Sequence, residues 1–503
     1  MALAFVALAA VLRSPALLYS VLNFDESLYL LIGADLTRGV LPYTGLCDRK
    51  PFGLFALFAL FAAAPFDAIV ASRLAASLAV GLTAYALHGI ARILFADGER
   101  LIGRTAGLAY VVFTLATGGL TSNAELFHNA LAVLGLRLAL AAALRDPDRP
   151  PRGLFIAAGL ALGLGVQVKQ TVLFDMAAFL AGFFLLTTPR LADLGRQARA
   201  AAPSLAALAV ASLLPTLAVI LLYVATGHWG EWLTANVTAQ RGFVDDRSQG
   251  FELGPTLRAM AEQAPLWVAA VVAALGAPRL LRGRGVEARP LLFLYVWIAS
   301  IAAGQVILRI AADHYFLQFL PALCLLAGLA FGRGVVAAVP AGGARAAVSA
   351  CVAALVLFAV AKNPYVNAAF MLKTRLVDGE AYAGDNARRL AEGLRPDLRP
   401  GDAVYVVGFM PVVYHLTGAV IPTRFAFTGL PHGTYAGRDG CPWVPQGEEI
   451  RRILDSRPRF VVFELGVFYD ELDLQVKALL RDRIRRDYRL RAAYPQHPSH
   501  TDY

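Results

Sequence analysis

The chain of 503 residues is 58% hydrophobic and 16% charged, with a mean hydropathy of +0.58. This composition excludes an ordinary soluble enzyme and predicts a mainly α-helical, polytopic membrane protein. The net charge of +10 comes mostly from arginines in short loops between apolar runs, which is typical of membrane topology. No basic, aromatic nucleic-acid motif is present, so nucleic acid is not an expected partner.

Apolar runs recur from the N-terminus to about residue 361, and a membrane-spanning helix needs about 20 such residues. The first run is followed by further spans, so we expect a retained helix rather than a cleaved signal peptide. We predict about eleven transmembrane helices. They cover residues 2–22, 68–91, 104–118, 126–144, 153–168, 171–188, 203–225, 264–281, 290–308, 315–331 and 346–361.

The arginine-rich loops predict the topology. With the N-terminus inside, these loops all fall on the cytoplasmic side, as the positive-inside rule requires. Outside then lie the first outer loop (23–66), a later outer loop (226–262) and the C-terminal region. If residues 153–188 formed a single bent helix, every later loop would be assigned to the opposite side of the membrane. The regular spacing of the arginine-rich loops favours two helices there.

The first outer loop is neither plain loop nor clean span. Residues 26–40, "ESLYLLIGADLTRGV", have apolar residues at helical spacing and predict an amphipathic helix in the membrane interface. "LPYTG" breaks that helix. "KPFGLFALFALFAAAPF" is short and aromatic, which favours a second interfacial or re-entrant helix.

Ionisable and polar residues gather at the predicted outer ends of the helices, where charges usually mark a polar cavity or pathway. A carboxylate there can act as a general base on an acceptor hydroxyl, and cations can hold an anionic leaving group such as phosphate. The set comprises Asp25, Glu26, Asp48, Arg49, Lys50, Glu125, His128, Lys169, Arg309, Asp313, His314 and Tyr315.

From about residue 363 the chain changes to a mixed α/β pattern. "GDAVYVVGF" and "PRFVVFEL" read as buried strands, whereas "DGEAYAGDNARRLAEGL" and "LDLQVKALLRDRI" have helical spacing. We therefore expect a transmembrane domain over 1–362 and a small extracytoplasmic α/β domain over 363–503.

The first outer loop, "FDESLYLLIGADLTRGVLPYTGLCDRKPFGLF", resembles that of the GT-C glycosyltransferases, of the protein O-mannosyltransferase (dolichyl-phosphate-mannose-protein mannosyltransferase) and aminoarabinose-transferase kind. "TSNAELF" is similar to that superfamily's second acidic motif, and "DHYFLQFLPALCLLAG" to its later His-Tyr and Pro helix. The resemblance implies a GT-C fold and an integral-membrane enzyme. The abundance of Ala, Arg and Leu suggests a bacterial source, so we expect the enzyme in a bacterial cytoplasmic membrane. Such an enzyme moves a sugar from a polyprenyl-phosphate donor to a lipid, glycan or protein acceptor on the outer side.

The resemblance also implies roles for residues. Asp25 would be the catalytic base, and inversion at the anomeric carbon would follow. Lys50, Arg309 and His314 would bind the donor phosphate. Auxiliary or acceptor residues would be Glu26, Asp48, Glu125 and Tyr315.

Two departures from the family pattern bear on these roles. Lys50-Pro51-Phe52 replaces the usual Lys-Pro-Pro, and Arg49 stands where some relatives have Glu. The second change puts a metal site built on that Glu in doubt, although Asp48 can supply a carboxylate. No cofactor is required by the sequence, and a divalent metal stays open.

Purely structural interpretations of the same residues are also possible. Asp25 favours a helix cap, Lys50 can snorkel at the interface, His314 can be structural, and Lys169 can be an accident of a tight turn. Among the cysteines, Cys324 and Cys351 fall in predicted spans.

A disulfide between Cys47 and Cys441 is a further hypothesis, because both fall on the predicted outer side. Rival functions are a lipid-linked sugar flippase or transporter, which also carries intramembrane charges, and a glycan ligase or lipid phosphotransferase.

Overall fold

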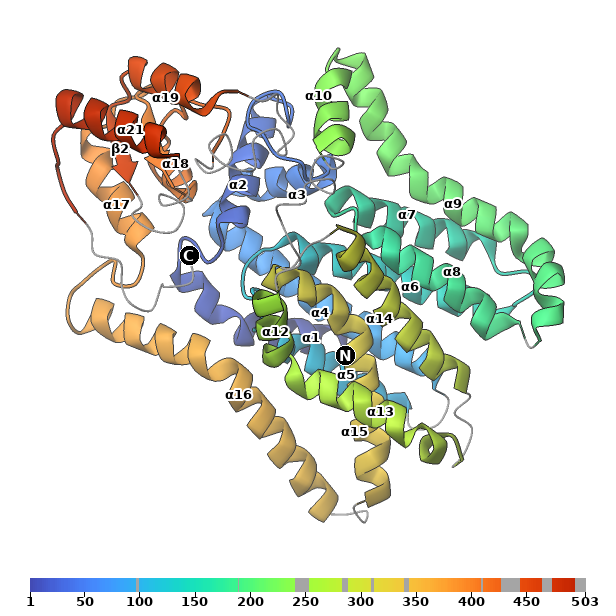
Figure 1. The fold of residues 1–503 in the computed structure, drawn as a ribbon. Helices are drawn as coiled ribbons and strands as arrows, with labels where there is room; N and C mark the ends of the chain where they lie inside the picture. Colours follow the sequence, from blue (N-terminus) through green and yellow to red (C-terminus); the bar gives the residue numbers. More distant parts are fainter. Residues whose placement is uncertain are drawn as a thin grey trace. The chain divides into compact units, whose positions relative to one another are not determined.

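The computed structural model describes residues 1–95, 99–188, 190–239, 253–282, 288–308, 312–338, 343–408, 410–426, 444–463 and 473–493. Helices make up most of the regular structure in these ranges (Figure 1). The chain divides into two compact units. Unit 1 comprises Met1–Ser14, Arg73–Leu221 and Gln249–Pro364, and unit 2 comprises Pro15–Ser72, Leu222–Ser248 and Tyr365–Tyr503.

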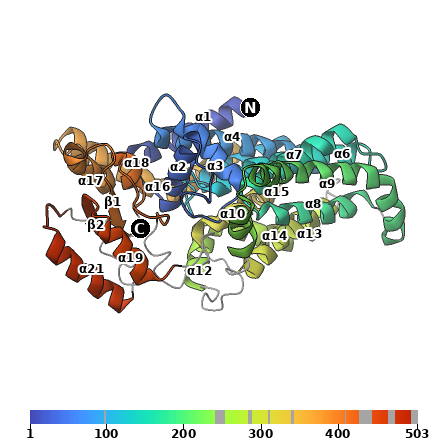
Figure 2. The same ribbon diagram turned by 90° about the horizontal axis from the view of Figure 1, so that it is seen from above.

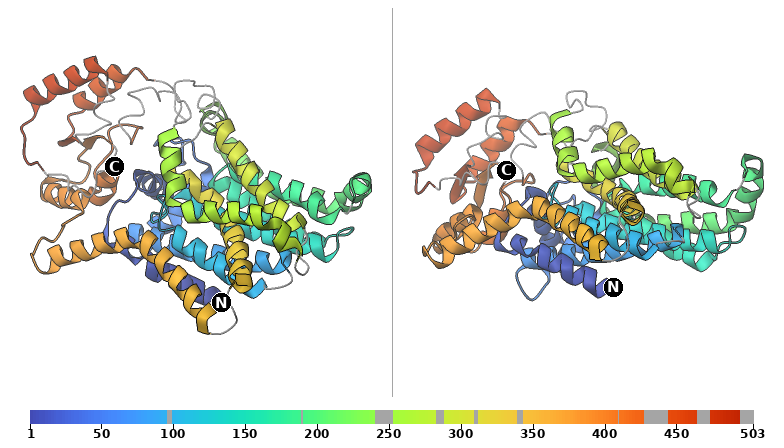
Figure 3. Two further views of the ribbon diagram at one scale, coloured as in Figure 1. Left: turned by 60° about the horizontal axis from the view of Figure 1, so that its bottom comes forward. Right: turned by 90° about the horizontal axis from the view of Figure 1, so that it is seen from below.

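Unit 1 is built from long apolar helices that pack side by side (Figure 1, Figure 3). Within it α6 packs against α7, α5 against α15, and α8 against α14. Its elements are α1 (Ala2–Leu12), α4 (Ala68–Leu94), α5 (Glu99–Phe113), α6 (Ala124–Arg145), α7 (Arg152–Val168), α8 (Val172–Thr187), η2 (Leu191–Asp193), α9 (Leu194–Ala225), α12 (Leu253–Glu262), α13 (Ala264–Arg282), α14 (Ala288–Leu308), η4 (Asp313–Phe319), α15 (Leu320–Ala338) and α16 (Gly343–Leu376). Of these, α4, α9 and α16 continue into the residues of unit 2.

Each predicted span overlaps a helix, and the polytopic helical character expected from the composition is confirmed. Among the described residues, 6 helices are long and apolar enough to cross a membrane, or up to 7 if the bent pair α12 and α13 counts as one span. Four further apolar helices are shorter: Ala2–Leu12, Phe52–Ala62, Arg152–Val168 and Val172–Thr187. The eleven predicted spans each correspond to one of the described helices, and this measure of length and composition admits 6 or 7 of those helices as complete spans.

The first predicted span shows why apolar runs overstate helix length. The run continues to residue 22, but α1 ends at Leu12 and a 3₁₀ turn, η1 (Ser14–Leu18), follows. Pro15 lies in that turn, has no backbone N–H and disfavours the α conformation of the residue before it. The guanidinium of Arg13, which is 2% exposed, donates to the carbonyls of Leu120 and Thr121 at 3.1 and 2.9 Å.

The region 153–188 forms two helices, as the arginine loops favoured. α7 ends at Val168 and α8 begins at Val172, so the break consists of Lys169–Thr171. α7 also approaches α9 closely, because a Cβ added at Gly163 would lie 3.0 Å from the Cα of Ser212 in α9. Small residues allow such close backbone approach between membrane helices.

Both helices expected in the first outer loop are present in unit 2, as α2 (Phe24–Thr37) and α3 (Phe52–Ala62). They pack directly on one another. At their crossing, a Cβ on Gly33 would lie 2.6 Å from the carbonyl carbon of Phe58. Only glycine fits at this crossing without moving the α3 backbone.

The C-terminal part of unit 2 has the predicted α/β character. Strand β1 (Val404–Val407) pairs in parallel with β2 (Phe460–Phe463), with Val404 opposite Phe460. Helices lie around the two strands (Figure 2). They are α17 (Asn386–Leu394), η5 (Arg395–Asp397), α18 (Val412–Thr417), α19 (Gln446–Asp455) and α21 (Leu474–Asp487). Their core contains Tyr405, Val407, Ile450, Ile453, Leu454, Val476 and Leu480.

Unit 2 joins stretches that are far apart in sequence. Asp385 accepts hydrogen bonds from the backbone N–H of Ser20, at 2.9 Å, and from its hydroxyl. The backbone N–H of Cys47 donates to the carbonyl of Arg424 at 2.8 Å, and α18 packs on α2. Two short elements, α10 (Trp229–Leu233) and the π-helical turn η3 (Thr234–Thr238), complete the unit.

The cysteines divide into two kinds. Cys47 is disulfide-bonded, whereas Cys324 and Cys351 carry free thiols. Cys441 lies outside the described residues, so the pairing of Cys47 with Cys441 stays a prediction. Cys324 is buried, but Cys351 is exposed.

Candidate functional site

The first turn of α2 places Asp25. Asn23, not Asp25, is the N-cap: its side-chain oxygen accepts a hydrogen bond from the Asp25 backbone N–H at 2.8 Å. The capping interpretation of Asp25 is therefore wrong, because Asn23 already fills that position. Asp25 is half-buried in the first helical turn, where the helix dipole favours a negative charge.

Asp25 and Lys50 both approach the same tyrosine. The hydroxyl of Tyr29, one turn along α2, donates to Asp25 Oδ2 at 3.1 Å. Lys50 Nζ lies over the Tyr29 ring, 5.9 Å from its centroid. The predicted base and the predicted phosphate-binding cation therefore share one neighbour within unit 2. Tyr29 was not among the predicted site residues, although its i, i+4 spacing from Asp25 on a predicted helix indicates that the two side chains can meet.

The side chain of Glu26 accepts a hydrogen bond from the backbone ahead of α2. Its side chain is 1% exposed, and Oε1 accepts a hydrogen bond from the N–H of Leu22 at 3.1 Å. This contact resembles the backward reach of the acidic residue in a capping box, which satisfies an N–H ahead of the helix. Glu26 thus fixes the entry into α2.

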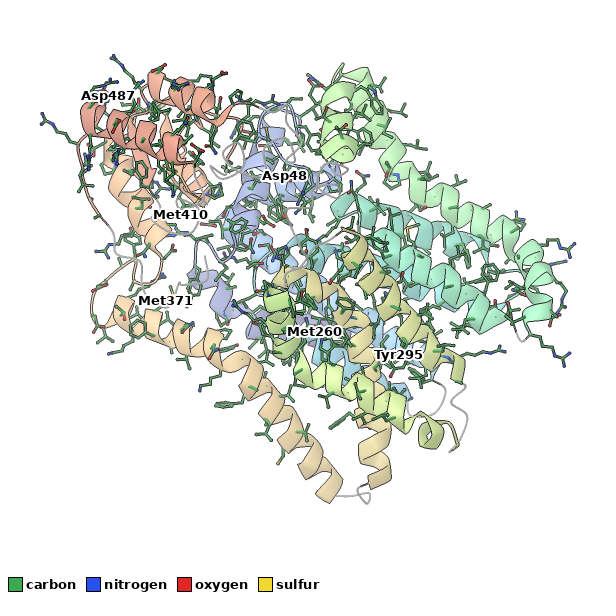
Figure 4. All side chains as sticks on the ribbon, in the orientation of Figure 1. Asp48, Met260, Tyr295, Met371, Met410 and Asp487 are labelled. Atoms are coloured by element: carbon green, nitrogen blue, oxygen red, sulfur yellow. The ribbon has the colours of Figure 1, made fainter. Side chains whose placement is uncertain are left out.

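Asp48, which is labelled in Figure 4, and Tyr43 shape the turn that presents Lys50. Asp48 Oδ1 accepts from the backbone N–H groups of Arg49 and Lys50, at 2.5 and 3.0 Å. The Tyr43 hydroxyl donates to the Lys50 carbonyl at 2.7 Å. Burial raises the pKa of Asp48, while nearby Lys50 and the two backbone hydrogen bonds act in the opposite direction.

A second group of site residues forms in unit 1. Glu125, at the start of α6, makes an ion pair with Lys169 from the break between α7 and α8. His314 Nε2 lies 3.7 Å from Glu125 Oε1. Lys169 Nζ lies 3.4 Å from the ring centroid of Tyr315. The side chains of Glu125 and Lys169 are only 2% and 6% exposed.

Lys169 has a larger part in the structure than its sequence position suggested. It is buried and paired, so the view that it is an accident of a tight turn is not supported. The usable signal was the cost of a charge within an apolar stretch. Its partner was not readable, because Glu125 lies 44 positions earlier in the chain.

A cavity of 840 Å³ lies within unit 2, between α2 and the C-terminal part. Arg38, Arg424 and Arg452 line it together with Asp35 and Glu449. Arg452 donates to both carboxylate oxygens of Glu449, at 2.8 and 2.5 Å, and Arg38 pairs with Asp35. The lining residues of α2 follow helical three-to-four spacing, so they occupy a different face from Tyr29 and Gly33, which contact α3.

The predicted site residues therefore fall into two groups. Asp25, Glu26, Asp48 and Lys50 lie together in unit 2, and the second group, in unit 1, comprises Glu125, His314 and Tyr315. Arg309 lies outside the described residues. Within the described ranges, no group of three or more His, Cys, Asp or Glu side chains is placed to hold a metal ion.

Comparisons with known proteins bear on the fold. No protein-family model matches the sequence, and no curated protein matches it significantly. The structure is similar to ArnT from Cupriavidus metallidurans bound to undecaprenyl phosphate, with a TM-score of 0.53 and 18% identity over 83% of this chain and 85% of that one. It is also similar to the same protein in the apo state, with a TM-score of 0.54 and 18% identity over 83% and 84%.

A further similar structure is the archaeal oligosaccharyltransferase AglB from Archaeoglobus fulgidus, in complex with an inhibitory peptide and a dolichol-phosphate. Its TM-score is 0.49, with 13% identity over 82% of this chain and 63% of that one. The likeness to ArnT covers most of both chains. The chain therefore shares the fold of ArnT, and the GT-C fold class predicted from its first outer loop is confirmed.

Proposed function

We propose that the protein is a membrane glycosyltransferase that moves one sugar from a polyprenyl-phosphate donor to an extracytoplasmic acceptor. The observation that carries the proposal is the meeting of Asp25 and Lys50 at Tyr29, in the loop whose motifs suggested this chemistry. A carboxylate and an ammonium group beside one ring supply a base and an anion-binding cation.

In the proposed reaction Asp25 takes the proton of an acceptor hydroxyl. The acceptor oxygen forms a bond to the anomeric carbon as the bond from that carbon to the phosphate oxygen breaks. The polyprenyl phosphate leaves with the bonding electron pair. Because the attack comes from the face opposite the leaving group, the configuration at the anomeric carbon inverts. The Tyr29 hydroxyl orients the carboxylate throughout.

The donor phosphate is proposed to bind Lys50, with His314 and Arg309 as further contacts. Lys50 is held in place through its own backbone, which bonds both Asp48 and Tyr43. Such fixed donors stabilise a developing charge without reorganisation. The ArnT structure that contains undecaprenyl phosphate supports a polyprenyl phosphate as the lipid carrier.

The acceptor, a lipid, glycan or protein, is proposed to engage unit 2. Its 840 Å³ cavity carries guanidinium and carboxylate groups that suit a hydroxyl-rich ligand. We propose that the site and the C-terminal region lie on the outer face of a bacterial cytoplasmic membrane. The positive-inside rule assigns the arginine-rich loops to the cytoplasmic face, which leaves the site and the C-terminal region on the opposite face.

The test is transfer of radiolabelled sugar from a panel of polyprenyl-phosphate donors, in membranes that contain the wild type or Asp25→Asn. We expect turnover by the wild type and its loss in Asp25→Asn. Asp193→Asn is the matched control, because that carboxylate pairs with Arg196 at the surface. A product with retained configuration would contradict the mechanism. Lipid movement across the bilayer without transfer would instead indicate a flippase.

A further inference from the structure

The segment η4, which carries His314 and Tyr315, is held by side chains from three other parts of unit 1. Three consecutive carbonyls of η4 each accept a hydrogen bond from a side-chain amide. Gln305 donates to Tyr315 at 3.1 Å, Gln263 to Phe316 at 3.1 Å, and Asn129 to Leu317 at 2.9 Å. We name Asn129, Gln263 and Gln305 the carbonyl clamp.

The members of the carbonyl clamp are buried and come from separate elements. Asn129 lies in α6, Gln305 in α14, and Gln263 at the 79° bend between α12 and α13. Their exposed fractions are 2%, 9% and 0%. A buried amide costs free energy unless it is hydrogen-bonded. All three amides direct a donor to the same short backbone segment.

The clamp acts on an unusual stretch of backbone. η4 is a 3₁₀ helix of 7 residues, and runs longer than about 3–4 residues are uncommon because their hydrogen bonds are poorer. External donors to the carbonyls compensate for that weakness. The segment continues directly into α15, which begins at Leu320.

The first turn of η4 delivers two side chains to the buried ion pair. His314 Nε2 lies 3.7 Å from Glu125, and the Tyr315 ring lies under the Lys169 ammonium. Asn129 and Glu125 occupy one face of α6, four positions apart. The same helix face therefore holds both the backbone of η4 and the carboxylate that its histidine meets.

We propose that Asn129, Gln263 and Gln305 are positioning residues: they hold η4 as a 3₁₀ helix and thereby fix His314 for binding of the donor phosphate. The second half rests on the proposed function, because it takes His314 as a phosphate contact. The first half, the immobilisation of η4, is independent of any activity.

The test compares Gln305→Leu with Gln197→Leu in the full-length protein in lipid nanodiscs. Gln197 is an equally buried amide of unit 1 that donates to the Pro147 carbonyl at 2.5 Å, away from η4. Two quantities are measured: amide hydrogen exchange across residues 313–319, and the KM and kcat for the polyprenyl-phosphate donor. Both variants are repeated in combination with His314→Ala.

Loss of one clamp bond is expected to speed exchange in 313–319 by about tenfold, and to raise the donor KM by a similar factor with a smaller change in kcat. The KM effects of Gln305→Leu and His314→Ala should be non-additive, whereas Gln197→Leu should add to His314→Ala independently. Equal exchange in Gln305→Leu and Gln197→Leu would overturn the clamp. Faster exchange with a KM like that of Gln197→Leu would overturn its role in donor binding.

A wild type that transfers no sugar from any donor would refute the proposed function and, with it, the donor-binding role. The exchange measurement would still decide whether the clamp holds η4. The two failures are therefore distinguishable.

Discussion

Breaking the Glu125–Lys169 pair should be among the most costly changes in the transmembrane helices. The two side chains are 2% and 6% exposed, so neither can recover full hydration when its partner is removed. Removing one partner of a buried pair costs about 3–5 kcal/mol. We expect this loss of unfolding free energy for Glu125→Gln, which leaves the Lys169 ammonium without its carboxylate.

The double variant separates pairing from simple packing. Glu125→Gln combined with Lys169→Met removes both charges and keeps similar volumes, so its stability should lie within about 1 kcal/mol of the wild type or above it. The assay is reversible unfolding of the purified protein in mixed micelles, for the wild type, both single variants and the double variant. A single-variant loss below about 1 kcal/mol, as for a surface pair, would refute the reasoning, and so would a double variant that equals the sum of the singles.

Other changes give separable outcomes. Glu26→Gln, which weakens the acceptor of the Leu22 N–H, should lower stability by about 1 kcal/mol and leave the donor kcat unchanged in a transfer assay; a larger effect on kcat would point to a chemical role. Burial lowers the pKa of His415, so the folded state favours the neutral ring. Its stabilising contribution is fully present above the unfolded pKa of about 6.5 and is lost as the pH falls from there through the lower folded pKa. Thermal unfolding between pH 5 and 8 should accordingly show a weaker pH dependence in His415→Asn, and an unchanged slope would contradict this. Gly33→Val, which forces its Cβ against the Phe58 backbone, should lower stability more than Gly230→Val, where an added Cβ meets nothing within 4 Å, as measured by the same unfolding assay.

The helical architecture was readable from the sequence because hydrophobic run length and arginine loops report directly on membrane helices. The helices of the first loop and the two C-terminal strands could also be predicted, since hydrophobic periodicity and turn residues are signals within one segment. The ends of the helices were predicted less well. The first helix, α1, ends before Pro15 rather than at residue 22, and Asn23 rather than Asp25 is the N-cap of α2.

The residues of the candidate site could be predicted from the sequence, but the contacts between them could not. Asp25 and Lys50 stood out by motif, yet their meeting at Tyr29 depends on how α2 and α3 cross. The pairing of Lys169 with Glu125 and the amides on η4 depend on helices that are distant in sequence. Patterns within one segment carry no information about such partners.

The bond between Ser20 and Asp385 has a consequence for biogenesis. Its two residues are 365 positions apart in the chain, and ribosomes add roughly 5–20 residues per second. The segment that holds Asp25 therefore waits about 20–70 s for the residues that complete its unit. During that interval α2 lacks α18, which packs on it in the complete protein, so this stage of synthesis is where we expect chaperones and proteases to act on the nascent protein.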